Sequence, residues 1–181
     1  MDLADLPTRL RLFFALWPSA EARSALTGWQ GELRERCGGR AMEADSLHLT
    51  LLFLGDVPRE RLPEAIGMAH DLHLPPFRVR LDRAHHWPHN HIVYAAPDDP
   101  PPELARLAEA LQQRAIDRHF SVERRPYHPH VTLLRNADAP LTALPRFDAT
   151  GWTANGFSLL ISRHRPDQPR YRSLADYALT G

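Results

Sequence analysis

The chain has no lysine, a single cysteine and no long hydrophobic run, and each absence narrows what the protein can be. Cys37 cannot form an internal disulfide, which fits a reducing compartment and a buried structural thiol. The longest apolar stretches, near 12–17 and 49–54, are far too short to cross a bilayer, and the acidic start lacks a signal-peptide pattern. We therefore expect a cytoplasmic monomer with no membrane partner.

The charge is balanced, because 22 basic residues, all arginine, face 22 acidic ones. No overall field therefore favours binding to nucleic acid. A hydrophobic content of 43% and 24% charged residues are ordinary for a globular protein of 181 residues, long enough for a real core. We expect residues 1–181 to form one domain, built from two similar halves.

One string of residues occurs twice: a histidine, an aliphatic residue, a threonine and two leucines, at 48–52 and again at 130–134. A chain of this composition should contain the full string roughly 0.002 times by chance. A strand alternates its side chains between two faces, so in each copy histidine and threonine point one way and the aliphatic residues the other. Each copy therefore predicts a strand with one face in the core and one polar face.

The spacing of apolar residues predicts a duplicated order of elements around these two strands. Strands are expected at 9–16, 47–54, 77–81, 91–96, 130–135, 156–163 and 171–178. Helices are expected from Ser19 to Gly38, after Pro58, and before the second motif with apolar residues from Leu104 to Ala115. A turn is expected around 166–169. We interpret this as an α+β fold of two pseudo-symmetric lobes, each an antiparallel sheet with helices outside, and a cleft between them.

Two matched motifs suggest acid–base chemistry on a phosphate. One neutral imidazole can accept a proton while a second, protonated, donates one, and hydrolysis of a phosphodiester needs both. The hydroxyls of Thr50 and Thr132 can donate to non-bridging phosphate oxygens. The residues alone do not decide which of His48 and His130 is the acid. No carboxylate-rich magnesium site adjoins the motifs, so we expect a route with no metal and no cofactor.

These residues resemble the two-histidine (2H) phosphoesterase superfamily, specifically the bacterial and archaeal RNA 2′,3′-cyclic phosphodiesterases, also called 2′-5′ RNA ligases. The likeness rests on the strand from Arg11 to Leu16 before a helix, on His48 to Gly55, on Pro129 to Arg135, and on the tail from Leu160 to Tyr171. It implies hydrolysis of RNA terminal 2′,3′-cyclic phosphate to a 2′-phosphomonoester, with His48 protonating the departing 3′ oxygen and His130 activating water. It also implies a weak reverse ligation and RNA partners such as tRNA fragments.

Further residues are candidates for substrate binding. Arg135, at the end of the second motif strand, can clamp a phosphate. Phe14, Trp87 and Tyr94 are candidates for stacking on a base, although aromatic residues in strands are more often core. A basic rim is expected from the arginines at 124, 125, 163, 165, 170 and 172. We treat His128 as a neighbour of the site rather than a catalyst.

Other interpretations remain open at this stage. The histidine cluster at 85–91 invites a metal site, but no second ligand pair follows and we interpret it as a solvated turn. The protein could instead cleave a small cyclic nucleotide derivative, which a small closed pocket would favour. A nucleotide- or RNA-binding module without turnover is a third candidate, although binding alone does not require two matched histidines.

Overall fold

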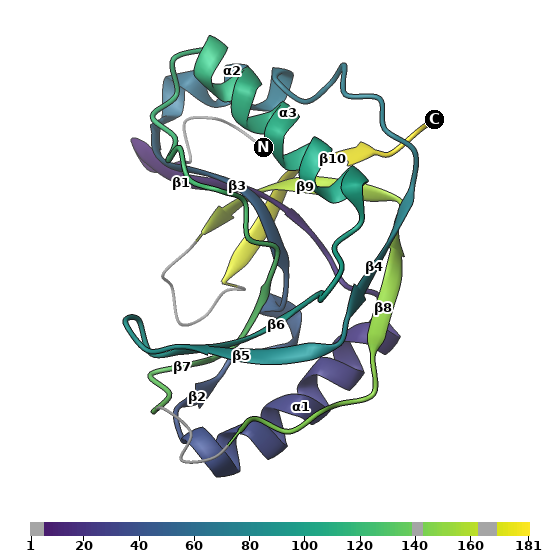
Figure 1. The fold of residues 1–181 in the computed structure, drawn as a ribbon. Helices are drawn as coiled ribbons and strands as arrows, with labels where there is room; N and C mark the ends of the chain where they lie inside the picture. Colours follow the sequence, from purple (N-terminus) through teal and green to yellow (C-terminus); the bar gives the residue numbers. More distant parts are fainter. Residues whose placement is uncertain (1–5, 139–142, 163–169) are drawn as a thin grey trace.

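The computed structural model describes residues 6–138, 143–162 and 170–181. Within these residues the chain forms a main antiparallel sheet, a separate two-stranded ribbon and three α-helices (Figure 1). The elements are β1 (Arg9–Leu16), α1 (Ala20–Cys37), β2 (Arg40–Ala41), β3 (Leu49–Pro58), α2 (Leu62–Gly67), β4 (Phe77–Leu81), β5 (Arg83–Trp87), β6 (Ile92–Ala96), α3 (Pro102–Asp117), β7 (Val131–Arg135), β8 (Thr150–Ala154), β9 (Gly156–Ser162) and β10 (Tyr171–Ala178). Short 3-10 turns precede β3 (Ala44–Ser46) and α2 (Arg59–Arg61).

The main sheet consists of two halves that meet at a single residue pair. Its strands run in the order β10-β9-β1-β3-β7-β6-β5, with β2 paired to β7. Strands β3 and β7 are joined only through Leu49 opposite Val131, whereas the strand pairs inside each half extend over several residues. The two motif strands therefore touch beside their histidines and diverge from there (Figure 1).

The helices are exchanged between the halves. Helix α1, which follows β1 of the first half, packs on β7 and β8, while α3, which precedes β7, packs on β3 and β4. The predicted stripe of α1 is buried at Leu26, Trp29 and Leu33, and Ser19 caps its N-terminus by accepting from the amide of Ala22 at 3.2 Å. Each half thus carries the helix of the other, which keeps them together around one core.

The α+β class and most of the predicted strands agree with the structure. Strand β3 is longer than predicted, because Gly55 adopts a positive φ of 71° inside a paired strand instead of ending it. The helix expected after Pro58 is a 3-10 turn followed by the short α2. Strands β5 and β8 were not predicted. The turn expected at 166–169 lies outside the described residues.

Strand β5 corrects the interpretation of 85–91 as a solvated turn. His85, His86 and Trp87 pair with β6, opposite Tyr94, Val93 and Ile92, and only the residues after them form the hairpin turn. The polar histidines concealed the alternation that marks a strand. In the described ranges, no helix has the length and apolar character needed to cross a membrane.

Candidate active site

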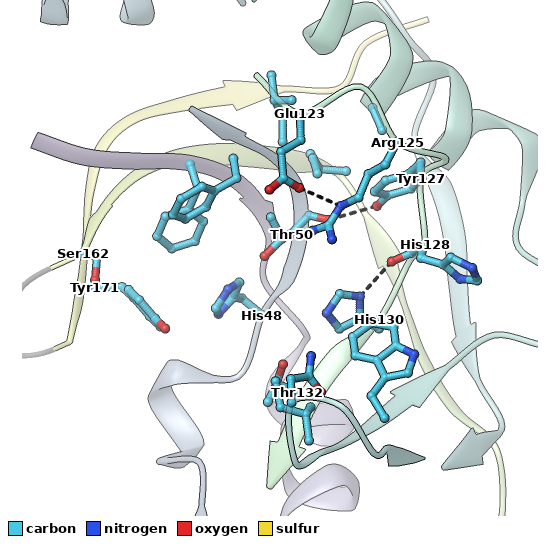
Figure 2. Close-up of a pocket in the computed structure, with 18 of the residues that line it drawn as sticks. His48, Thr50, Glu123, Arg125, Tyr127, His128, His130, Thr132, Ser162 and Tyr171 are labelled. Atoms are coloured by element: carbon cyan, nitrogen blue, oxygen red, sulfur yellow. Dashed lines mark hydrogen bonds and ion pairs between the residues drawn. The ribbon is translucent and has the colours of Figure 1, made fainter. Parts of the chain in front are cut away.

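The two motifs line one pocket. His48, Thr50, His130 and Thr132 surround a common space, and the pocket around them has a volume of about 900 Å³ (Figure 2). The antiparallel pair of Leu49 and Val131 explains this arrangement, because it sets each histidine beside the threonine of the other strand. Leu49 and Val131 themselves are fully buried, so the alternation predicted for both motifs is observed.

The same backbone irregularity follows both threonines. Phe14 pairs with Leu52 and Ala15 with Thr50, so Leu51 is an extra residue in β3. In β7, Leu133 is extra in the same way, because Val93 pairs with Leu134 and Tyr94 pairs with Thr132. A bulge shifts the alternation by one residue. The shift points the side chains of Phe53 in β3 and Arg135 in β7 toward the pocket. Without the bulges, strict alternation would point both side chains away from it.

Buried polar groups hold the two bulges in place. The side-chain amide of Gln30, in α1, donates to the carbonyls of Leu133 and Met42, each at 2.9 Å. In the first motif, the hydroxyl of Tyr127 donates to the carbonyl of Thr50 at 3.1 Å. Both contacts join elements far apart in the sequence, so tertiary structure rather than local preference supports these two irregular positions.

Both imidazoles are oriented by the same hydrogen bond. Nδ1 of His48 lies 2.7 Å from the carbonyl oxygen of Ser46, and Nδ1 of His130 lies 2.7 Å from that of His128. A carbonyl only accepts, so each Nδ1 carries the proton and donates it. Nε2 of each ring is then the atom left for substrate, without a proton when the ring is neutral.

Aromatic rings enclose each histidine. The ring of His48 lies 4.8 Å from that of Tyr171 and 5.0 Å from that of Phe13. The ring of His130 lies 4.7 Å from Trp87 and 5.5 Å from Tyr94. Burial among these rings disfavours the charged form.

The pKa values of both histidines are accordingly depressed. Burial lowers the pKa of His48 to about 4. The pKa of His130 is also lowered, again mainly by burial, and the guanidinium of Arg135 adds to the effect at both rings. Both imidazoles are therefore neutral at neutral pH in the free protein, and a bound anion would raise their pKa values.

Arg135 lies in the pocket, as predicted. Its Nε is buried and has no hydrogen-bond partner among the described residues, and burial lowers the pKa of the guanidinium. A buried donor without a partner is costly, and a phosphate oxygen would satisfy it.

The aromatic residues predicted to bind substrate differ in their placement. The prediction that Phe14 binds substrate is wrong, because its side chain is fully buried, at 0% exposure, and packs in the core against Phe157 and Tyr177. Tyr94, at 8% exposure, is also buried and supports the ring of His130 instead of offering a face to a base. Trp87 does line the pocket, with its ring against His130.

Several pocket residues were not singled out from the sequence. They include Arg11, Phe13, Phe53, Tyr127, Ser162 and Tyr171. The motif pattern contained a usable signal for Phe53, since it stands five residues after His48 as Arg135 stands five after His130. Of the expected basic rim, Arg125 and Arg170 line the pocket, whereas Arg124 and Arg172 are exposed and do not line it. Positions 163 and 165 lie outside the described residues.

Comparison with known proteins identifies the family. A family model described as LigT like Phosphoesterase matches twice, over residues 16–94 and 95–171. The RNA 2′,3′-cyclic phosphodiesterase of Escherichia coli is 35% identical over 94% of this chain and 97% of its own length. The chain belongs to the LigT-like phosphoesterases. The resemblance inferred from the two motifs is thereby confirmed, and the two matches fit a duplicated fold.

Further relatives agree with this assignment. The RNA 2′,3′-cyclic phosphodiesterase of Thermus thermophilus is 32% identical over 95% of this chain and 91% of its own length. The crystal structure of E. coli LigT complexed with 3′-AMP superposes with a TM-score of 0.87 at 34% identity, covering 96% of this chain and 99% of that one. The predicted fold class is confirmed by this agreement over nearly the whole chain.

Proposed function

We propose that this phosphoesterase hydrolyses the 2′,3′-cyclic phosphate at the end of an RNA to a 2′-phosphomonoester. The main support for this proposal is the pair of matched imidazoles in one pocket. In each of them Nδ1 donates to a backbone carbonyl, so Nε2 is available to a substrate. The relatives named RNA 2′,3′-cyclic phosphodiesterase support the substrate. We further propose that residues 1–181 act as one bilobal domain in the cytoplasm, as a monomer.

The proposed reaction uses one histidine on each side of the phosphorus. Nε2 of His130 accepts a proton from a water molecule as its oxygen bonds to phosphorus. Nε2 of His48, protonated, donates its proton to the 3′ oxygen as the bond from phosphorus to that oxygen breaks. Thr50 and Thr132 donate hydrogen bonds to the non-bridging oxygens, where charge grows in the transition state, and Arg135 adds a positive charge beside them.

The depressed pKa values fit these roles once substrate binds. His130 needs to be neutral to act as base, and burial favours that form. His48 needs a proton, which its pKa of about 4 denies it in the free protein. The negative charge of a bound cyclic phosphate stabilises the imidazolium and raises that pKa, so protonation of His48 accompanies binding.

Incubation of the protein with an oligonucleotide that ends in a 2′,3′-cyclic phosphate, in the presence of EDTA, tests the proposal. We expect conversion to the 2′-phosphomonoester, identified against authentic 2′- and 3′-phosphate standards. Formation of the 3′-phosphate, or loss of activity in the chelator, would contradict the assigned chemistry. In the described part of the chain no group of three or more histidine, cysteine or acidic side chains is arranged to hold a metal ion.

A further inference from the structure

The two sides of the pocket differ in charge. Tyr171 and Ser162 lie beyond His48, on the side away from His130 (Figure 2). Arg11 and Arg170 line the pocket with them. The register of the sheet explains this grouping, because Leu12 pairs with Ile161 and Ser162 with Tyr171, which places Arg11 on the strand next to Ser162. We call Arg11, Ser162, Arg170 and Tyr171 the basic wall.

Within residues 6–138, 143–162 and 170–181, the guanidiniums of the basic wall form no ion pair with a carboxylate. Among the described residues, the ion pairs involve neither Arg11 nor Arg170, although Asp56 stands opposite Arg11 in the register. Nε of Arg170 is buried and has no hydrogen-bond partner in the part of the chain that the structure describes. Arg11 instead lies over the ring of Phe53, at 4.9 Å from its centre, and Arg170 lies 5.7 Å from the centre of the Tyr171 ring. Two cations held against aromatic rings are thus open to an anion.

A second pocket wall, formed by Glu109, Gln112, Glu123 and Arg125, has a different charge. There Glu123 forms an ion pair with Arg125 at 2.9 Å, and Gln112 donates to the carbonyl of Glu123. Glu109 adds a further negative charge to that wall. An anion that extends beyond the catalytic groups is therefore attracted to the basic wall and repelled from the opposite one.

The proposed reaction places a second anion at the basic wall. In-line attack by water activated at His130 puts the departing 3′ oxygen, and the ribose that bears it, on the side of His48. In RNA this ribose carries a phosphodiester on its 5′ oxygen, and a mononucleoside cyclic phosphate with a free 5′ hydroxyl lacks that charge. The pocket volume of about 900 Å³ leaves space for this neighbouring group.

We propose that Arg11 and Arg170 bind the internucleotide phosphate on the 5′ side of the terminal nucleotide. This site rests on the proposed function and on His48 as the acid. It makes the protein selective for oligonucleotide ends over mononucleoside 2′,3′-cyclic phosphates. Arg170 also lowers the pKa of His48, after burial and other effects, which places its guanidinium near the catalytic pair.

Three substrates and three variants test the site. The substrates are a mononucleoside 2′,3′-cyclic phosphate with a free 5′ hydroxyl, a dinucleotide ending in a cyclic phosphate, and that dinucleotide with an uncharged methylphosphonate between its nucleosides. The variants are Arg170→Gln, Arg11→Gln and the control Arg125→Gln, which removes a charge from the opposite wall. The measured quantity is kcat/KM at constant salt, with circular dichroism to check folding.

We expect kcat/KM of the wild-type protein to be about tenfold higher for the dinucleotide than for either the mononucleotide or the methylphosphonate. The loss of one charge-assisted contact to the phosphate has an effect of this size. Arg170→Gln should lose this tenfold preference, measured as the ratio of kcat/KM for the dinucleotide to kcat/KM for the mononucleotide, and Arg11→Gln should act in the same direction. Arg125→Gln should keep the preference. Because the methylphosphonate and Arg170→Gln remove the same contact, combining them should cause no further loss.

Equal loss on all three substrates, or an unchanged preference in Arg170→Gln and Arg11→Gln, would overturn the phosphate site. Wild-type protein that cleaves the dinucleotide and the methylphosphonate equally well would also overturn it, while leaving the proposed function intact. Failure of the wild-type protein to cleave any of the three substrates would instead overturn the proposed function and, with it, the site.

Discussion

The two motif strands reach the pocket along the same backbone path and meet different surroundings there. In β3 and β7 alike, a histidine, a buried aliphatic residue and a threonine are followed by a bulged leucine. Beyond the bulge the copies differ: Phe53 is 42% exposed under the guanidinium of Arg11, whereas Arg135 is itself the cation. The duplicated backbone brings two matched imidazoles to one pocket, and the residues around them distinguish the two sides.

The side chains around the two histidines also differ between the two sides of the pocket. His48 adjoins Tyr171 and the basic wall, while His130 is enclosed by Trp87 and Tyr94. A symmetric site would accept a cyclic phosphate in two orientations. In our proposal, charge on one side of the pocket, rather than the two histidines themselves, sets the direction in which RNA enters.

The largest expected effect comes from removing either imidazole. We expect His48→Ala and His130→Ala each to lower kcat/KM by about 10²–10⁴, since each removes one proton transfer. His128→Ala is the matched control, because His128 serves His130 through its backbone carbonyl, which the variant keeps. Activity of either variant within tenfold of wild type would contradict equal need for both copies.

A sulfur leaving group separates the two roles. In a 2′,3′-cyclic substrate with sulfur at the 3′ bridging position, the departing thiolate needs no proton. We expect His48→Ala to regain most of its activity on this substrate and His130→Ala to regain none. Steady-state rates of both variants on the oxygen and sulfur substrates give the answer, and rescue of His130→Ala alone would reverse the assignment.

The partly buried histidines predict a pH dependence of stability. With a folded pKa of about 4 against 6.5 in the unfolded chain, His48 binds more protons when unfolded between these values, so stability falls as pH falls. The full contribution from pH 6.5 to below 4 is about 3 kcal/mol. Urea unfolding of wild type and His48→Gln at pH 7 and 4.5 measures it. An identical pH difference in both proteins would contradict the predicted proton uptake.

The two threonines should contribute equally to turnover, with a smaller effect than the two histidines. Thr50→Val and Thr132→Val each remove one hydroxyl donor and keep the shape, so we expect losses in kcat of about 10². Serine variants, which keep the hydroxyl, should retain most activity. Losses that differ by more than tenfold between the two valine variants would show that the two copies contribute unequally to the transition state.

The sequence predicted the strands with clear alternation and the four residues of the motifs, because their spacing encodes a face. It did not predict which face β1 presents, since Phe13 and Phe14 are both apolar and only tertiary packing decides that Phe13 reaches the pocket and Phe14 the core. The period of two also assigns Arg135 to the wrong face, and the bulge that corrects it depends on Gln30, far away in the sequence.

The exchange of helices was equally hidden from sequence reasoning. The apolar stripe of α1 indicates that one face is buried but carries no information about the sheet that covers it. Strand β5 was concealed because four histidines, at positions 85, 86, 89 and 91, stand in and just after it and suggest a solvated segment. Both features matter for the site, since β5 brings Trp87 to His130.

Nitrogen NMR of the histidine side chains during titration with a nucleoside 2′-phosphate tests the central claim most directly. If both rings face one phosphate, the Nε2 resonances of His48 and His130 shift together, with the same dissociation constant and saturation at one equivalent. Both Nδ1 resonances should keep the signature of a protonated nitrogen bonded to a carbonyl. A shift of only one Nε2, or two separate dissociation constants, would contradict the shared site.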